Sequence, residues 1–383
     1  MNTFYKLVCL SAAFMVSSSS FADTSDVSQS PMQSNSSMMK KNCPAFDQGL
    51  GLPDNKYAAA YNAPACISVK NGWDFDLFGS FIYWHASQED MDVAYVPVTV
   101  ATTATGVVPG AVAFQNVQYE PGFKAGFGFN TNYDGWVFRG EYTWLHQKVS
   151  GSTTAPTLAT GAAGTFYAND WFVNHTTGDD NTGASVSSSW KMHLDMVDAV
   201  FARPFYEGAQ LAVVPFGGLR GLWIRQNLDI DLLSSTKTVN CYSNNHSSSW
   251  AVGPTTGVGG HWFLGRGFRF EGNAAASILY TQYTTISHSE QDSQLFSAGG
   301  LAVTSSMSNL NVLRPVGQLS LGLAWGSYCC NNECYFDISA DYEFLYFWQQ
   351  NVMREWAGQI QGYADPGADL QMHGLTVSAR FDF

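Results

Sequence analysis

Histidine and aspartate side chains spaced two to four residues apart are the first candidates for chemistry in this sequence. His193 with Asp195, Asp337 with Asp341, and the single His261 are residue types that act as general acids and bases. The sequence contains no G-x-S-x-G elbow, H-E-x-x-H, P-loop or complete G-x-G-x-x-G to accompany them. Polar residues that alternate along strands and face water explain the same spacings. The sequence therefore predicts a protein that is not an enzyme and needs no cofactor or metal, with a hydrolase as the weaker alternative.

Cysteines are the second group of reactive side chains, and the chain has seven of them. Such a content is typical of proteins exported to an oxidising compartment. Cys9 lies in an N-terminal apolar run that export removes, and the remaining cysteines are Cys43, Cys66, Cys241, Cys329, Cys330 and Cys334. Their even number allows complete pairing in about 15 ways. Cys330 and Cys334 have the spacing of half a zinc site, but no second half follows, which favours disulfides or a crosslinking thiol.

The first 22 residues have the pattern of a cleavable signal peptide. Lys6 precedes an apolar run over Leu7–Val16, and Ser20-Phe21-Ala22 places small residues three and one before a cut. We expect cleavage after Ala22, and no lipoprotein, because Cys9 cannot become the mature N-terminus. Residues 23–70, rich in Ser, Met, Asn, Gln and Pro, predict a mobile N-terminal periplasmic segment.

The composition favours strands with one face in lipid. Only 13% of residues are charged, against about 25% in soluble domains, while aromatic residues reach 15%. Beyond the signal peptide no apolar run approaches the roughly 18 residues of a membrane helix. The formal net charge of −13 argues against a nucleic-acid partner, because neutralising phosphates requires a basic surface.

Alternation of apolar and polar residues begins near Trp73 and continues to the C-terminus. In residues 136–149 one face carries Trp136, Phe138, Tyr142 and Trp144, and the other carries Arg139, Glu141, Thr143 and Gln147. Residues 268–281, 313–325 and 336–346 repeat this period of two. From Trp136 to Trp144 such a strand covers about 20 Å along the membrane normal at a tilt of about 40°. A soluble β-sandwich would have strands of only about five or six residues.

This alternation predicts an all-β, transmembrane antiparallel β-barrel over residues 71–383 with about ten strands. The predicted strands are 73–85, 121–132, 136–149, 190–203, 211–225, 252–264, 267–285, 310–326, 334–348 and 369–383. The connections alternate between short and long, which is typical of short periplasmic turns and long external loops. Both termini then lie in the periplasm. A further hairpin around Val93, Tyr95 and Val98 would raise the strand number to twelve.

Two functions fit the polar faces of these strands. In a porin, the charged residues line the pore and tune its selectivity: Arg139, Glu141, Arg220, Arg269, Glu271, Arg314, Asp337, Asp341, Glu343, Arg380 and Asp382. In a structural or adhesive barrel, the same side chains pair and fill a narrow interior. An additional hairpin would widen the barrel and favour conduction.

The last strand ends in an aromatic pattern. Phe381 and the terminal Phe383 share a face with Leu375, Val377 and Ala379. This is similar to the C-terminal signal that the barrel-assembly machinery recognises. We therefore expect that machinery and the outer-membrane lipid to be partners of the chain.

Several segments resemble the Legionella-type major outer-membrane protein family, which has members in chlamydia-related bacteria. They are Gly135–Tyr142, Arg203–Tyr206, Pro215–Ile224, Phe268–Asn273 and Asp341–Phe344, and the likeness spans about residues 70–383. The resemblance implies an abundant general porin for small hydrophilic solutes, disulfide-linked within the envelope and exposed at the cell surface.

The predicted topology also separates the cysteines. Cys329, Cys330 and Cys334 fall on one short periplasmic turn, on the same side as Cys43 and Cys66 of the leader. Cys241 falls in the predicted 226–251 loop on the other side, beyond the roughly 7 Å that a disulfide can bridge. Five periplasmic cysteines cannot all pair within one chain, which predicts disulfide links to other copies or to periplasmic proteins. Local stapling of the turn is the alternative.

Overall fold

The computed structural model describes residues 65–67, 69, 75–96, 99–100, 107–108, 111–131, 135–155, 166–168, 171–172, 182–233, 240–292, 303–360 and 367–383. The predicted signal peptide, Cys43 and nearly all of the predicted N-terminal segment lie outside these residues. No helix among them is long and apolar enough to cross a membrane.

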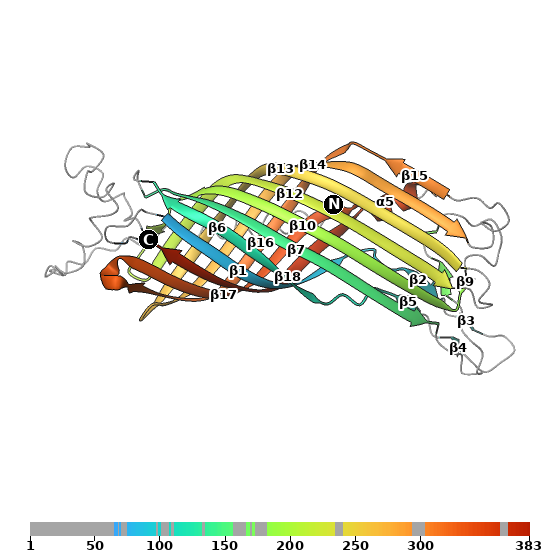
Figure 1. Ribbon diagram of the computed structural model, residues 1–383, viewed down its shortest axis with the longest axis horizontal. Helices are drawn as coiled ribbons and strands as arrows, with labels where there is room; N and C mark the ends of the chain where they lie inside the picture. The colour runs from blue at the N-terminus through green and yellow to red at the C-terminus, as the bar shows by residue number, and fades with distance from the viewer. Residues whose placement is uncertain are drawn as a thin grey trace, which may run out of the picture. The chain divides into compact units, whose positions relative to one another are not determined.

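Ten long strands form a closed antiparallel barrel, as the sequence predicted (Figure 1). They are β1 (Phe75–Gln88), β6 (Tyr119–Asn130), β7 (Val137–Thr154), β10 (Ser185–Ala202), β12 (Leu211–Leu233), β13 (Asn240–Gly265), β14 (Phe268–Asp292), β16 (Leu310–Cys329), β17 (Cys334–Asn351) and β18 (Ala368–Asp382). Each pairs with its neighbour in sequence. The first and last strands close the wall in a register from Asp76↔Asp382 to Gln88↔Leu370. Closure leaves no open sheet edge in the lipid, where unpaired backbone groups would cost several kcal/mol each.

The shorter strands do not widen this wall. β2 (Ala94–Val96), β5 (Ala111–Ala113), β8 (Phe166–Ala168) and β9 (Thr182–Gly183) form a separate sheet, and β3 (Thr99–Val100) pairs with β4 (Val107–Val108). β11 (Phe205–Tyr206) and β15 (Val303–Met307) pair only with β12 and β14 respectively. The segment around Val93 and Tyr95 therefore forms part of a small separate sheet, and the barrel keeps ten strands; Val98 lies outside the described residues.

Several strands extend further outward than the predicted boundaries. β12 continues to Leu233, β13 starts at Asn240 and β14 continues to Asp292, so much of the predicted 226–251 loop is wall. Cys241 consequently lies in β13, paired in register with Leu232 and Asp292, and not in a loop. The predicted loop 349–368 contains the helix α5 (Val352–Ile360).

The physical reason is an exchange of faces along each strand. On β10 the outward Val197 and Phe201 are 40% and 50% exposed, whereas the inward Met192 and Leu194 are fully buried. Within the membrane the outward face meets lipid and is apolar. Beyond it the outward face meets water, so the apolar side chains turn inward and form a core. The strand continues while its apolar residues change from the outward to the inward positions. A prediction from strict alternation therefore ends the strand too early.

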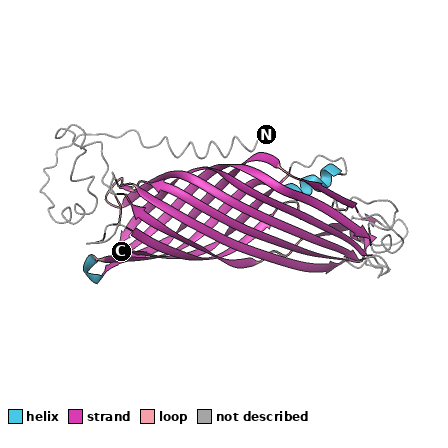
Figure 2. Cartoon of the chain, turned by 45° about the horizontal axis from the view of Figure 1, so that its top comes forward, coloured by secondary structure: helices cyan, strands magenta, loops and turns pink. Residues whose placement is uncertain are grey.

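The short turns lie at the opposite end of the barrel from α5, together with the C-terminus (Figure 2). β13 and β14 are joined through Arg266 and Gly267, with φ values of 54° and 85°. Two central residues with positive φ make the tight hairpin whose twist matches the flanking strands. The described N-terminal residues meet this end as well, because Ala65 N–H donates to the Pro204 carbonyl at 3.0 Å.

Candidate functional site: the barrel interior

All eleven charged residues predicted to line a pore lie on inward positions of the barrel strands. The burial pattern of each strand places them there: Arg139, Glu141, Arg220, Arg269, Glu271, Arg314, Asp337, Asp341, Glu343, Arg380 and Asp382. The strands carry them from different parts of the sequence to one interior surface. Their arrangement there is a set of ion-paired clusters.

Lys124 of β6 is the centre of the first cluster, and sequence reasoning missed it. Its ammonium Nζ lies 2.8 Å and 3.0 Å from the two carboxylate oxygens of Glu343 and 3.5 Å from Glu141. The side chain is 5% exposed and lies over the ring of Trp84. Its inward position between Phe123 and Ala125 is the sequence signal that reveals it.

Arg269 is the centre of the second cluster. Its guanidinium donates to both carboxylate oxygens of Asp337, with one contact of 2.9 Å, and lies 3.0 Å from Glu271. Tyr335 also donates to Asp337, at 3.2 Å. His261 approaches the same group, with Nδ1 3.7 Å from the Glu271 carboxylate.

Two further arginines bind carboxylates that the sequence did not single out. Arg220 makes a two-pronged contact with Asp198 at 2.7 Å and 2.9 Å, a geometry that suits the planar guanidinium. Arg380 lies 3.1 Å from Asp76 and also donates to Asp382. These pairs join strands β10 to β12 and β1 to β18, so each pair ties neighbouring strands of the wall.

The remaining predicted residues have polar or aromatic contacts. Arg314 donates to Gln349 at 2.9 Å, and Asp341 accepts a hydrogen bond from Ser339 at 2.9 Å. Arg139 lies over the ring of Phe78, 5.2 Å from its centroid. The interior is thus charged and largely self-paired.

The outer half of the interior contains a large apolar cluster, which the sequence reasoning did not anticipate. Inward side chains of the wall, such as Trp84, Leu145 and Trp190, belong to one buried cluster. Segments from the outer connections join this cluster: Met91, Val93, Ala94, Val96, Trp171, Phe172, Met353 and Ala357. We call these inserted segments, residues 91–96, 171–172 and α5, the mouth plug.

Polar contacts hold the mouth plug in place. Trp171 donates from its indole N–H to the Asp92 carbonyl at 2.8 Å, and Ser243 of the wall donates to the Trp171 carbonyl at 2.8 Å. Arg354 of α5 lies over the Trp171 ring, 5.0 Å from its centroid. The side chain of Asn351, immediately before α5, donates to the Glu89 carbonyl at 3.0 Å.

The candidate acid–base pairs do not assemble into one site. His193 and Asp195 face outward on β10, where Tyr142 donates to Asp195 at 2.5 Å. Asp337 accepts a hydrogen bond from Arg269. Asp341 also faces inward on β17, four residues further along the strand. His261 therefore meets the cluster around Arg269, separated from His193 by the barrel wall.

The cysteine turn is stapled locally. Cys329 and Cys334 form a disulfide, with their alpha carbons 5.2 Å apart, and Cys330 between them has an exposed free thiol. The sulfur atoms of all three lie within 4.8 Å of one another, so the disulfide occupies two of the groups that a metal would need. Cys66 is also disulfide-bonded.

The predicted assembly signal lies on the outside of the closing strand. Phe381 and Phe383 are 42% and 36% exposed, and their ring centroids are 5.8 Å apart. Phe383 donates its backbone N–H to the Phe75 carbonyl at 3.1 Å. The terminal residue therefore extends the seam between the first and last strands.

Comparisons with known proteins place this barrel in a family. No curated protein matches the chain in sequence. Among solved structures, the Escherichia coli outer membrane protease OmpT is similar at 9% identity, with 83% of this chain and 99% of that chain covered and a TM-score of 0.33. The Pseudomonas putida toluene transporter TodX is similar at 9% identity, with 85% and 94% covered and a TM-score of 0.26.

Both similarities are to chains of only 9% identity. The family model of the Legionella pneumophila major outer membrane protein precursor, in contrast, matches residues 64–383, which include the whole described barrel. That match agrees with the closed ten-strand wall and its lipid-facing outer surface. The chain belongs to the Legionella major outer membrane protein family and is an integral protein of the outer membrane.

Proposed function

We propose that this barrel is a porin for small hydrophilic solutes whose outer mouth is closed by a movable plug. The observation that carries the proposal is the difference between the two halves of the interior. The half towards the short turns is polar and charged, as a water-filled passage requires. The half towards the outside is closed by the mouth plug, which comes from connections between strands and not from the wall itself.

Part of the mouth plug can be deleted without breaking the barrel wall, because the strand ends that flank it are paired with each other. Asn351 and Ala368 are paired in register at the outer ends of β17 and β18, so residues 352–367 are replaceable by an Asn-Gly hairpin turn. Leu233 and Asn240 are paired in the same way. Replacing residues 234–239 by Asn-Gly is therefore a matched control that removes an outer connection and none of the described plug residues.

Conductance in planar bilayers tests the proposal. Refolded wild-type protein should give small or infrequent openings, and the variant without residues 352–367 should give larger and longer ones. The 234–239 control should behave like the wild type. No conductance in any of the three proteins would refute the porin proposal.

A non-conducting structural barrel is the second candidate, and the ion pairs favour it. Lys124, Arg220, Arg269 and Arg380 each contact a carboxylate within 3.1 Å, so these charges fill and brace the interior. This candidate predicts that the variant without residues 352–367 stays closed. Neither candidate includes a catalytic step.

We further propose that Cys330 links the barrel to other chains in the envelope. It is exposed on a short turn that the predicted topology places in the periplasm, and its neighbours Cys329 and Cys334 are bonded to each other. In non-reducing gels of envelopes alkylated at lysis, Cys330→Ser should remove the high-mass species. The double variant Cys329→Ser/Cys334→Ser, which retains Cys330, should still form them. Equal high-mass species with and without Cys330 would exclude this residue as the link.

A further inference from the structure

The outward face of β7, β10 and β12 changes in character just outside the lipid-facing band. The register of these strands aligns their outward residues in rows across the wall. In outward order the rows are Trp144–Asp195–Trp223, His146–His193–Arg225, Lys148–Lys191–Asn227 and Ser150–Ser189–Asp229. Aromatic residues thus give way to cations and then to hydroxyls and a carboxylate.

The second and third rows form a basic patch, which we define as Lys148, Lys191 and Arg225 with His146 and His193. Lys148, Lys191 and Arg225 are exposed, and the rings of the two histidines stack with their centroids 3.9 Å apart. The other described cations are elsewhere: Lys124, Arg139, Arg220, Arg269, Arg314 and Arg380 in the interior, Arg354 on α5, and Arg203 and Arg266 at the end with the short turns. In a chain with a formal net charge of −13, this gathering of cations stands out.

These cations are not neutralised by the part of the protein that the structure describes. Lys148 and Lys191 are directly paired across β7 and β10, an arrangement of like charges that destabilises a sheet. None of the three cations has a described carboxylate within 4.0 Å. An anion bound between the lysines would offset this electrostatic repulsion.

The acids on the same face already accept hydrogen bonds from other side chains. Asp195 accepts one from Tyr142, and Asp229 accepts bonds from Asn227 and Asn244. Both carboxylates keep their charge and flank the patch, Asp195 one row nearer the apolar band and Asp229 one row further out.

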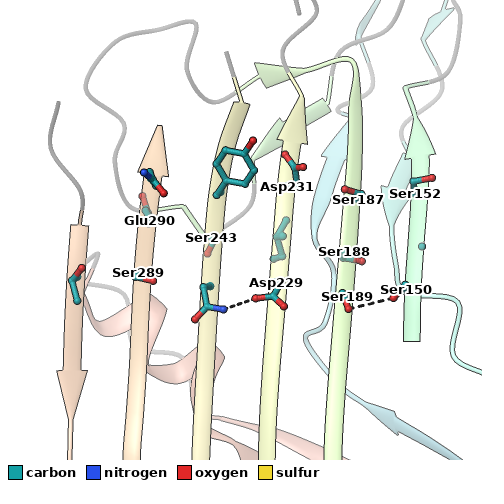
Figure 3. A pocket seen from close by; sticks show the side chains of 16 residues that line it. Ser150, Ser152, Ser187, Ser188, Ser189, Asp229, Asp231, Ser243, Ser289 and Glu290 are labelled. Atoms are coloured by element: carbon teal, nitrogen blue, oxygen red, sulfur yellow. Dashed lines mark hydrogen bonds between the residues drawn. The ribbon is translucent and has the colours of Figure 1, made fainter. Parts of the chain in front are cut away.

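A shallow polar groove begins in the next row outward. It has a volume of about 970 Å³ and is lined by Ser150, Ser152, Ser187, Ser189, Asp229 and Asp231 among others (Figure 3). Ser150 donates to Ser189 at 3.3 Å across β7 and β10. Hydroxyls and carboxylates in such density are the groups that bind the hydroxyls of a sugar.

The depth of the patch fits a membrane headgroup. Successive rows are two residues apart, which is roughly 5 Å along the membrane normal at a strand tilt of about 40°. The polar region of one leaflet is roughly 5–7 Å thick beyond the hydrocarbon. The row His146–His193–Arg225, about 5 Å outside the tryptophans that mark the edge of the apolar band, therefore lies at the level of the headgroups. The row with Lys148 and Lys191, about 10 Å outside the tryptophans, lies just beyond them.

We propose that this face binds a phosphorylated glycolipid of the outer leaflet, with its phosphates on the basic patch and its sugar in the adjoining groove. The acyl chains would lie along the apolar wall below Trp144 and Trp223. The apolar wall, the basic patch and the polar groove thus follow one another in the order of the acyl chains, phosphates and sugar of such a lipid. Charge complementarity and depth select this occupant over a protein partner.

Titration with bisphosphorylated lipid A in neutral detergent, followed by native mass spectrometry, tests the proposal. The variant Lys148→Gln/Lys191→Gln/Arg225→Gln should bind about 100-fold more weakly than the wild type, because each cation contributes roughly a factor of five at an anionic surface. The charge-preserving variant Lys148→Arg/Lys191→Arg/Arg225→Lys should bind like the wild type. Heat-modifiable electrophoretic mobility shows that each variant is folded.

Single substitutions and altered ligands complete the test. Lys191→Gln should weaken binding about five-fold, whereas Arg266→Gln, which removes an equal charge at the opposite end, should not. Lipid A without phosphates should bind poorly, and millimolar inorganic phosphate should not displace the lipid. Equal binding by the triple Gln variant, equal binding of the phosphate-free lipid, or displacement by inorganic phosphate would each overturn the proposal.

Discussion

Lys124 and Glu343 meet across the barrel interior, 2.8 Å apart, although 219 residues separate them in the chain. Their strands, β6 and β17, are not neighbours, because β1 and β18 lie between them. The pair therefore exists only after the barrel has closed. It makes the stability of the closed wall depend on single interior charges.

Replacing Lys124 should destabilise the barrel strongly. Lys124→Met leaves Glu141 and Glu343 close together without their cation, and breaking a buried pair in this way costs about 3–5 kcal/mol. The matched control is Lys191→Met, an exposed outward lysine whose removal relieves the like-charge pairing with Lys148, so this variant should not lose stability. Urea unfolding in detergent micelles measures both. Equal unfolding midpoints for the two variants would contradict a structural role for the interior pair.

Two tryptophans on adjacent strands allow the contribution of core packing to stability to be compared with that of the lipid-facing surface. Trp190 is fully buried in the outer half of the interior and donates to Gln226 at 3.2 Å, whereas Trp223 is 45% exposed on the lipid-facing side. Trp190→Ala should lower the free energy of unfolding by about 3–5 kcal/mol because it leaves a cavity. Trp223→Ala should lower it less. The opposite ranking in unfolding experiments would show that the outer half is not a packed core.

Ion selectivity should respond to three interior carboxylates in a conducting form of the protein. Asp337→Asn, Asp341→Asn and Glu343→Gln together remove negative charge, and Lys124 and Arg269 each lose one of their two carboxylate partners. The reversal potential in a salt gradient should therefore shift away from cations. The same changes should lower stability, so a refolding check accompanies the measurement. An unchanged reversal potential would place these residues outside the conducting path.

Removing the last residue should impair assembly. Phe383 is hydrogen-bonded to Phe75, and their rings lie 5.7 Å apart at the seam of the barrel. Deletion of Phe383 should reduce the heat-modifiable form in outer membranes and leave unfolded chain in the periplasm. Phe383→Tyr, which retains the ring, should assemble like the wild type. Normal assembly of the deletion would argue against a C-terminal signal.

The sequence by itself determined the class and size of the barrel. A strand between lipid and water must alternate with a period of two, so its central residues, such as Phe138 and Glu141, reveal their faces without any knowledge of neighbours. Counting these segments predicted ten strands, their antiparallel order and the gathering of the short turns at one end of the barrel. The family resemblance followed from the same segments.

The tertiary structure decided which residues meet. Closure and register determine that Lys124 contacts Glu343 and that Lys148 is paired with Lys191, and neither depends on spacing along one strand. The outer ends of the strands were misplaced because their apolar residues change from the lipid face to the interior, as at Met196 and Val197. Only the folded barrel shows that, further outward than this change, water lies outside the wall and a packed core lies inside it.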